Sequence, residues 1–207
     1  KSFCKTVFIF FVLFASQKHF GQHHSKMAVL LLSEKKTLQI QQELTYYNES
    51  ADTLTTIVLN DWNNAFSNKN TPLAKRFSDE FYRGFHLAKE EERGSTKDLN
   101  IDNANQQPIF WEKTKKNPDY IVVHLKEKLL PNQKTSFTLS YTVKIPSDKF
   151  TKYGYADNGA LQLKDWYLTP ARYENHTFLE NSNNNLDDIT NAICDLDINL
   201  KIPASLE

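Results

Sequence analysis

The clearest pattern in the chain is a strict alternation of apolar and polar residues over positions 137–145. Phe137, Leu139, Tyr141, Val143 and Ile145 share one parity, and the residues between them are polar. Successive side chains of a strand point to opposite faces, so the pattern predicts a strand with one face in a core and one in water. Pro146 ends it.

Two hairpins are predicted around this strand. A β-branched run at 120–125 precedes it, and the turn residues at 130–133 favour antiparallel pairing between the two. The second hairpin joins 153–155 to 161–163 through the tight-turn sequence Asp157-Asn158-Gly159.

Further strands are predicted on both sides of this region. Residues 37–47 are apolar at alternate positions, except that Gln42 interrupts the apolar face. Residues 54–62 are apolar at both parities, which predicts a central strand, and we expect it to form a hairpin with 37–47. Near the end, Leu196, Ile198, Leu200 and Ile202 alternate with polar residues and predict a last strand.

One helix is predicted, over about 71–92. Thr71 is a good N-cap, and Pro72 suits the first helical position. An apolar stripe recurs every fourth residue at Leu73, Phe77, Phe81 and Phe85, which indicates packing on a sheet. The fold class is therefore mainly β: an antiparallel β-sandwich or saddle-like curved sheets with one inserted helix.

The first residues have the pattern of a secretory signal peptide, expected to occupy 1–22. A basic head precedes an apolar run at 6–15, about half of the roughly 20 residues that a spanning helix needs. We therefore expect an exported protein (periplasmic, cell-surface or extracellular) without a stable membrane anchor. Residues 23–36 are expected to be a linker or edge segment, and 37–207 a β-domain truncated at its C-terminal end.

Composition and motifs narrow the function. Lys+Arg and Asp+Glu both number 25, so charge gives no reason to expect a nucleic-acid partner. None of the histidines is followed by Glu, so the H-E-x-x-H zinc motif is absent, and no motif for acyl transfer or nucleotide binding is present. Neither His86 nor His124 has a carboxylate or thiol at ligand spacing, and we interpret both as structural. No catalytic or metal-binding residue is assigned.

The acidic residues near the C-terminal end and the cysteine at 194 are interpreted without a functional role. An acidic cluster of Asp187, Asp188, Asp195 and Asp197 lacks calcium-loop spacing, which favours exposed acids over a calcium site. Cys194 is the sole cysteine after the predicted leader, and we interpret it as a small buried hydrophobic residue.

A series of motifs resembles a known family. They are Leu130-Pro131-Asn132, the alternating strand that ends at Pro146, Tyr153-Gly154-Tyr155, the run from Leu163 through Trp166 to Pro170, and the last strand up to Pro203. In this order they resemble the N-terminal β-domain of zinc aminopeptidases of the aminopeptidase N family, in a secreted bacterial branch. The resemblance covers roughly residues 37–203.

The resemblance implies a non-catalytic domain that packs on the catalytic domain of the same polypeptide and helps to shape the cleft for the peptide substrate. In that family the zinc-binding helix and the Gly-x-Met-Glu-Asn motif lie in the following domain. Here Met27 is the one methionine, and Glu-Asn does not follow it. No catalytic residue is therefore carried over, and zinc is expected in the missing catalytic domain. This chain alone is expected to hydrolyse no peptide bond, whereas the full-length protein is expected to be a metalloaminopeptidase.

Two alternatives stay open. Trp166, Tyr167 and Leu168 are the candidate domain interface, because the run around them is apolar at successive parities; a covered central strand is the alternative. Some family members use a Gln or Glu of this domain to bind the substrate, and Gln162 lies near the corresponding position, but we do not assign it this role.

The alternative function is a free-standing secreted β-sandwich binding or adhesion module, with Trp62, Trp111 and Trp166 as an exposed platform.

Overall fold

The computed structural model describes residues 22–113, 117–184 and 190–203. Its longer strands are β1 (His23–Leu32), β2 (Thr37–Tyr47), β3 (Leu54–Asn60), β4 (Ser95–Asn103), β6 (Tyr120–Leu129), β7 (Lys134–Lys144) and β13 (Cys194–Lys201). Its short strands are β5 (Trp111–Glu112), β8 (Gly154–Tyr155), β9 (Leu161–Gln162), β10 (Thr169–Pro170), β11 (Tyr173–Glu174) and β12 (Thr177–Phe178). The helices are α1 (Pro72–Asp79) and α2 (Gly84–Leu87), with 3₁₀ turns at Ser33–Lys35, Trp62–Phe66 and Glu90–Glu92.

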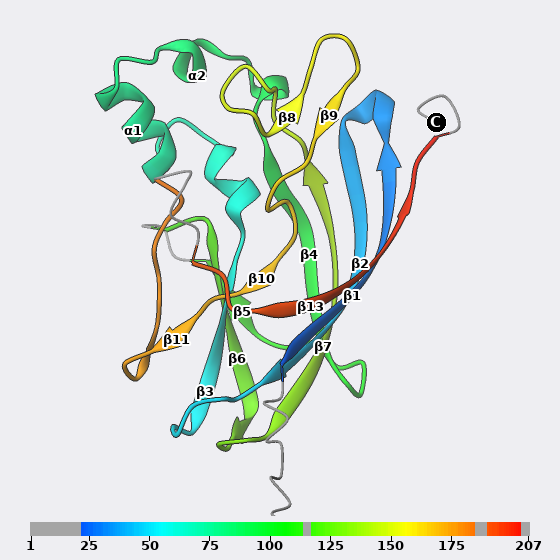
Figure 1. The fold of residues 1–207 in the computed structure, drawn as a ribbon, viewed down its shortest axis with the longest axis vertical. Helices are drawn as coiled ribbons and strands as arrows, with labels where there is room; N and C mark the ends of the chain where they lie inside the picture. Colours follow the sequence, from blue (N-terminus) through cyan, green and yellow to red (C-terminus); the bar gives the residue numbers. More distant parts are fainter. Residues whose placement is uncertain (1–21, 114–116, 185–189, 204–207) are drawn as a thin grey trace, which may run out of the picture.

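Two larger sheets form the body of the described chain (Figure 1). One has five strands in the order β13-β1-β2-β7-β4, and the other has four in the order β10-β3-β6-β5. Pairing within these sheets is antiparallel except between β1 and β13, which run parallel. Apolar side chains from both sheets and from the helical segment form one buried cluster. The predicted fold class is confirmed.

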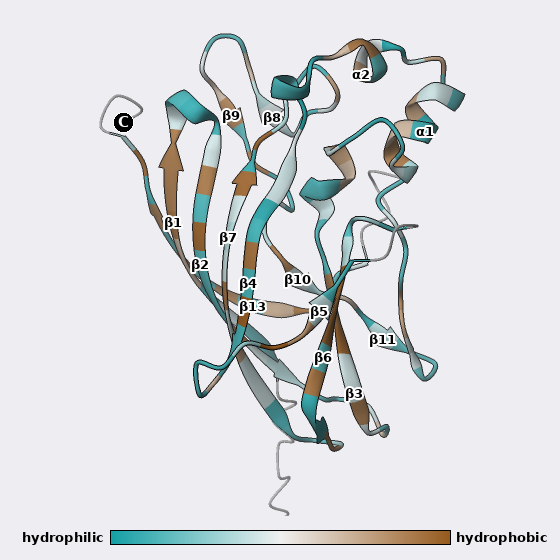
Figure 2. Ribbon diagram, turned by 180° about the vertical axis from the view of Figure 1, so that it is seen from behind, coloured by the Kyte–Doolittle hydropathy of each residue, from teal (hydrophilic) through white to brown (hydrophobic). Residues whose placement is uncertain are grey.

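The alternation seen in the sequence is the alternation of faces in the structure. Along β7, Phe137, Leu139, Tyr141 and Val143 are buried, while the residues between them are less so. Bands of hydrophobic and hydrophilic residues alternate in the same way along β2 (Figure 2), whose buried positions also follow period two. Each of these strands therefore presents one side to the core.

The predicted pairing of neighbouring strands is wrong in two places. β2 and β3 lie in different sheets, and so do β6 and β7. The turns between them are corners that carry the chain from one sheet to the other. The two corners also bind each other: Asn48 N–H donates to the Gln133 carbonyl, and Asn132 N–H donates to the Asn48 carbonyl, each at 2.9 Å. Residues typical of turns suit such a corner as well as a hairpin.

Residues 23–32 are an interior strand, not the linker or edge segment that we expected. β1 lies between β2 and β13. The inward positions hold two polar residues, His23 and Ser25, ahead of three apolar ones, and Ala28 and Leu30 point outward. This mixture conceals the alternation in the sequence. The predicted signal peptide falls almost wholly on residues 1–21, outside the described part.

The predicted single helix is divided. Thr71 is its N-cap as expected, because the Thr71 side chain accepts a hydrogen bond from Ala74 N–H. The helix ends at Asp79, because Phe81 adopts a left-handed conformation (φ 59°). Tyr82 N–H then donates a hydrogen bond to the Phe77 carbonyl, and the Phe77 and Tyr82 rings pack together. These contacts form a Schellman motif, which closes a helix. Phe81 leaves the predicted stripe and is 88% exposed, whereas Leu73, Phe77 and Phe85 are buried.

The second predicted hairpin is confirmed. β8 pairs with β9 around the turn at 156–160, in which Gly159 has a φ of 89°. A positive φ is a conformation that glycine adopts without strain.

Candidate functional site

An exposed apolar row lies on β13. β13 pairs with β1 in a register that places Leu196, Ile198 and Leu200 beside Ser25, Met27 and Val29. Neighbouring residues of paired strands share a face, so this row lies on the core-facing side of the five-stranded sheet. Met27 and Val29 are 2% exposed, but the three β13 residues are 42–45% exposed.

The row therefore lies on the core-facing side of the sheet, but the rest of the described chain covers it only in part. Ile202, just after β13, extends it and is 41% exposed. β13 is also the terminal strand of its sheet, so its outer edge has no strand partner in the described ranges. An apolar row at an open sheet edge is a surface on which another polypeptide can pair or pack.

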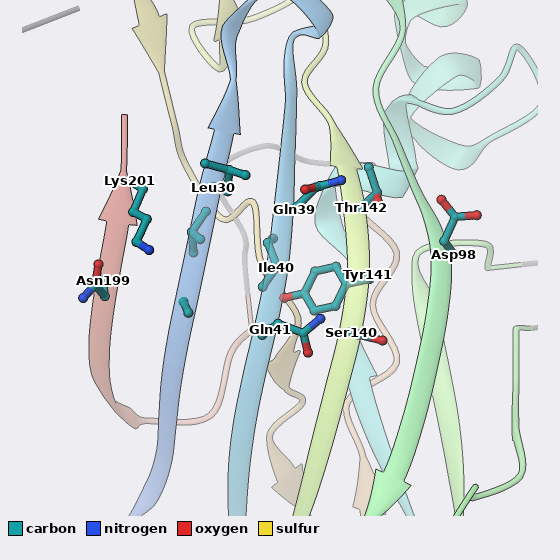
Figure 3. A pocket seen from close by; sticks show the side chains of 12 residues that line it. Leu30, Gln39, Ile40, Gln41, Asp98, Ser140, Tyr141, Thr142, Asn199 and Lys201 are labelled. Carbon is teal, nitrogen blue, oxygen red and sulfur yellow. The ribbon is translucent and has the colours of Figure 1, made fainter. Parts of the chain in front are cut away.

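The outward face of the same sheet carries a hollow of about 720 Å³ (Figure 3). Its walls are mostly side chains with amide, hydroxyl or charged groups from β2, β4, β7 and β13: Gln39, Gln41, Asp98, Ser140, Thr142, Asn199 and Lys201. Leu30 adds an apolar side chain. β13 thus contributes to two surfaces, an apolar one on the core side and a polar one outside.

A buried network fixes the strands beneath this hollow. Gln42 Nε2 donates to Ser25 Oγ at 2.8 Å and to the Leu168 carbonyl at 2.9 Å. Gln42 Oε1 accepts from the Tyr141 hydroxyl at 2.6 Å, and that hydroxyl accepts from Leu168 N–H at 3.1 Å. Burial raises the pKa of Tyr141, so its hydroxyl stays protonated. Gln42, which interrupts the apolar face in the sequence, ties β1, β2 and β7 to the segment before β10.

That segment contains the candidate interface residues, and the structure places two of them in the core of this chain. Trp166 is 8% exposed and Leu168 is 1% exposed. Residues 163–168 are not a strand, so the parity argument for a face left bare does not apply to them. Tyr167 is half-buried and packs edge-on against Trp166. Contact between Tyr167 and a following domain stays a prediction.

The three tryptophans do not form an exposed platform. Trp62 is buried, and its indole N–H donates to Asn191 Oδ1 at 2.8 Å. Trp111 is half-buried on β5, in the four-stranded sheet. Since Trp62 and Trp166 are enclosed in the core, neither side chain is available to a sugar or a protein.

Several histidines of the described chain contact a carboxylate or hydroxyl side chain. Contrary to our expectation, His124 has a carboxylate partner: β5 brings Glu112 within 3.0 Å of its Nε2. His24 meets Asp197 at 3.0 Å, and His86 meets Ser78. Nowhere in the described ranges do three His, Cys, Asp or Glu side chains gather as metal ligands.

The remaining candidates are dispersed. Asp187 and Asp188 lie outside the described residues. Asp195 is exposed on β13, and Gln162 is exposed on β9. Cys194 is only partly buried, and burial raises the pKa of its thiol to about 11, which disfavours the reactive thiolate.

Comparison with known proteins gives a faint likeness. No protein-family model matches the chain, and no curated protein does. The similar solved structures include an M1 zinc metallopeptidase of Deinococcus radiodurans, a substituted form of it with a Tyr-Ser-Ala substrate, and a two-domain M1 zinc metallopeptidase with L-arginine. The identities are 14–15% and the TM-scores 0.34–0.35, over 60% of this chain and 21% of those chains.

The chain thus spans about a fifth of the length of these M1 zinc metallopeptidases, the aminopeptidase N family. A likeness at this level carries no argument about activity. Separately, the described residues contain no helix that is long and apolar enough to cross a membrane.

Proposed function

We propose that this chain is the N-terminal β-domain of an exported zinc metalloaminopeptidase. In this role it packs on the catalytic domain of the same polypeptide and helps to shape the peptide-binding cleft. The chain itself performs no catalytic step, and the zinc and the nucleophilic water belong to the domain that follows. Export rests on the basic and apolar pattern of the first residues.

The order of the sequence motifs supports the proposal, together with what each motif does in the fold. The alternating strand that ends at Pro146 is β7, next to the centre of the five-stranded sheet. Tyr153-Gly154-Tyr155 enters the β8–β9 hairpin, and the run up to Pro170 leads into β10. The motifs are therefore structural, as a supporting domain requires.

The observation that carries the proposal is the apolar row of Leu196, Ile198, Leu200 and Ile202. Each residue is more than two-fifths exposed. Covering four such side chains favours association by roughly 25 cal/mol for each Å² removed from water. A catalytic domain packed against β13 covers them, and a free-standing module leaves them in water.

Substitution of Ile198 tests this packing. In the polypeptide that includes the catalytic domain, we expect Ile198→Lys to lower the free energy of unfolding by about 2–4 kcal/mol, because it buries an unpaired charge in the interface. In this chain alone the same change is expected to cost about 0.5 kcal/mol or less, since the side chain faces water. Denaturant unfolding of both proteins measures the difference.

Asn199→Lys is the matched control. It places the same charge on the same strand but on the outward face, where Asn199 is exposed. It is expected to change neither protein by more than about 0.5 kcal/mol. If Ile198→Lys has the same small effect in both proteins, the row does not pack on the catalytic domain.

A further inference from the structure

A second hollow, of about 570 Å³, lies where β1 begins and β2 ends. It is lined by His23 at the start of β1, by Tyr46 and Tyr47 at the end of β2, and by residues of the following corner and of β11. Pockets that bind small ligands have volumes in this range. We call it the His23–Tyr46 hollow.

Two buried side chains with unused hydrogen-bond donors line this hollow. The His23 and Tyr46 rings stack with centroids 4.4 Å apart, and the residues are 5% and 3% exposed. His23 Nδ1 accepts a hydrogen bond from Tyr47 N–H, so the neutral ring carries its proton on Nε2. Burial lowers the pKa of His23 to about 4, which keeps the ring neutral near pH 7.

Within the described part of the chain, neither His23 Nε2 nor the Tyr46 hydroxyl has a hydrogen-bond partner. Neither atom is among the fully enclosed polar atoms without partners, so both reach the hollow. Side chains so deeply buried normally have their polar atoms paired. Two unpaired donors in one hollow indicate a ligand that accepts hydrogen bonds.

The charges around the hollow restrict the ligand class. Of the lining side chains, the one Lys or Arg is Arg172, which is already paired with Glu174. A phosphate or carboxylate group therefore meets no free cation. The remaining charge is the Glu49 carboxylate, which accepts hydrogen bonds from hydroxyl groups. No metal-ligating group of three His, Cys, Asp or Glu forms in the described part of the chain.

The lining also includes aromatic and apolar side chains beside its polar ones. Tyr47 and Tyr173 are half-buried, and Ile193 is 77% exposed beside them. A saccharide satisfies both sets of groups: its hydroxyls accept from His23 and Tyr46 and donate to Glu49, and its C–H faces pack on the rings. We propose that the His23–Tyr46 hollow binds a short neutral saccharide. This site is independent of the packing function proposed above.

The test is titration of the purified protein with a panel of neutral mono- to tetrasaccharides, followed by calorimetry and by NMR of the His23 ring N–H. We expect saturable binding of at least one sugar with a Kd on the order of 1 mM or tighter. Tyr46→Phe removes only the unpaired hydroxyl. It is expected to weaken that binding about tenfold while Tm stays within about 1 °C.

Tyr82→Phe is the matched control, because the Tyr82 hydroxyl donates to the Lys149 carbonyl away from this hollow. It is expected to leave sugar binding unchanged. The proposal is overturned if no sugar in the panel gives a saturable response. It is also overturned if Tyr46→Phe binds as tightly as the unsubstituted protein, or if inorganic phosphate displaces the bound sugar.

Discussion

Replacement of Trp166 by Ala is expected to lower the free energy of unfolding by about 3–5 kcal/mol, the cost of deleting a buried aromatic side chain. Trp166 is 8% exposed, and it lies two residues before Leu168, whose main chain is bonded to Gln42 and Tyr141. Domains are stable by only about 5–15 kcal/mol, so the loss is a large part of the total. Thermal unfolding should show Tm lowered by roughly 10 °C.

Phe110→Ala is the control, because it also removes an aromatic side chain but from an exposed position. Phe110 is 66% exposed, so its removal is expected to change stability by about 0.5 kcal/mol or less. If Trp166 were instead an interface residue, Trp166→Ala would keep the same cooperative transition as the unsubstituted chain and would be more soluble. That outcome would contradict a core position for Trp166.

Acidification is expected to weaken the fold through His23. Burial lowers the pKa of His23 from 6.5 to about 4, so the folded chain favours the neutral ring. This contribution is fully present above pH 6.5 and is lost as the pH falls towards 4, because the unfolded chain then binds the proton first. The expected loss is about 3 kcal/mol between pH 7 and pH 4.

Comparison with His23→Phe isolates this contribution from those of the other titrating groups. The variant leaves Tyr47 N–H without its acceptor, so its stability is lower at neutral pH. Its unfolding free energy is nevertheless expected to fall less steeply with acid, by the amount assigned to His23. Parallel pH profiles for the two proteins would show that His23 is protonated as readily in the fold as outside it.

Local patterns predict local structure well in this chain. The alternation at 137–145 and at 196–202 corresponds to β7 and β13, Thr71 caps α1, and Asp157-Asn158-Gly159 turns between β8 and β9. Each of these features depends on residues close in sequence, which periodicity and turn chemistry describe directly.

Sheet membership and exposure were harder to predict, because they depend on distant residues. The corners at 48–53 and 130–133 have the composition of hairpin turns, yet each joins the two sheets. The β13 row has the alternation of any half-buried strand, and its exposure depends on what lies opposite. The His23–Tyr46 hollow combines residues from β1, β2 and β11 with Ile193, and no local signal joins them.

The most direct test of the proposed function is the coding sequence beyond the codon for Glu207. If this chain is a domain of a zinc aminopeptidase, we expect the open reading frame to continue into a Gly-x-Met-Glu-Asn motif and then an H-E-x-x-H helix, whose two histidines bind zinc. The apolar row of β13 would then have the catalytic domain as its cover. A reading frame that stops at once, or continues without H-E-x-x-H, would contradict the account.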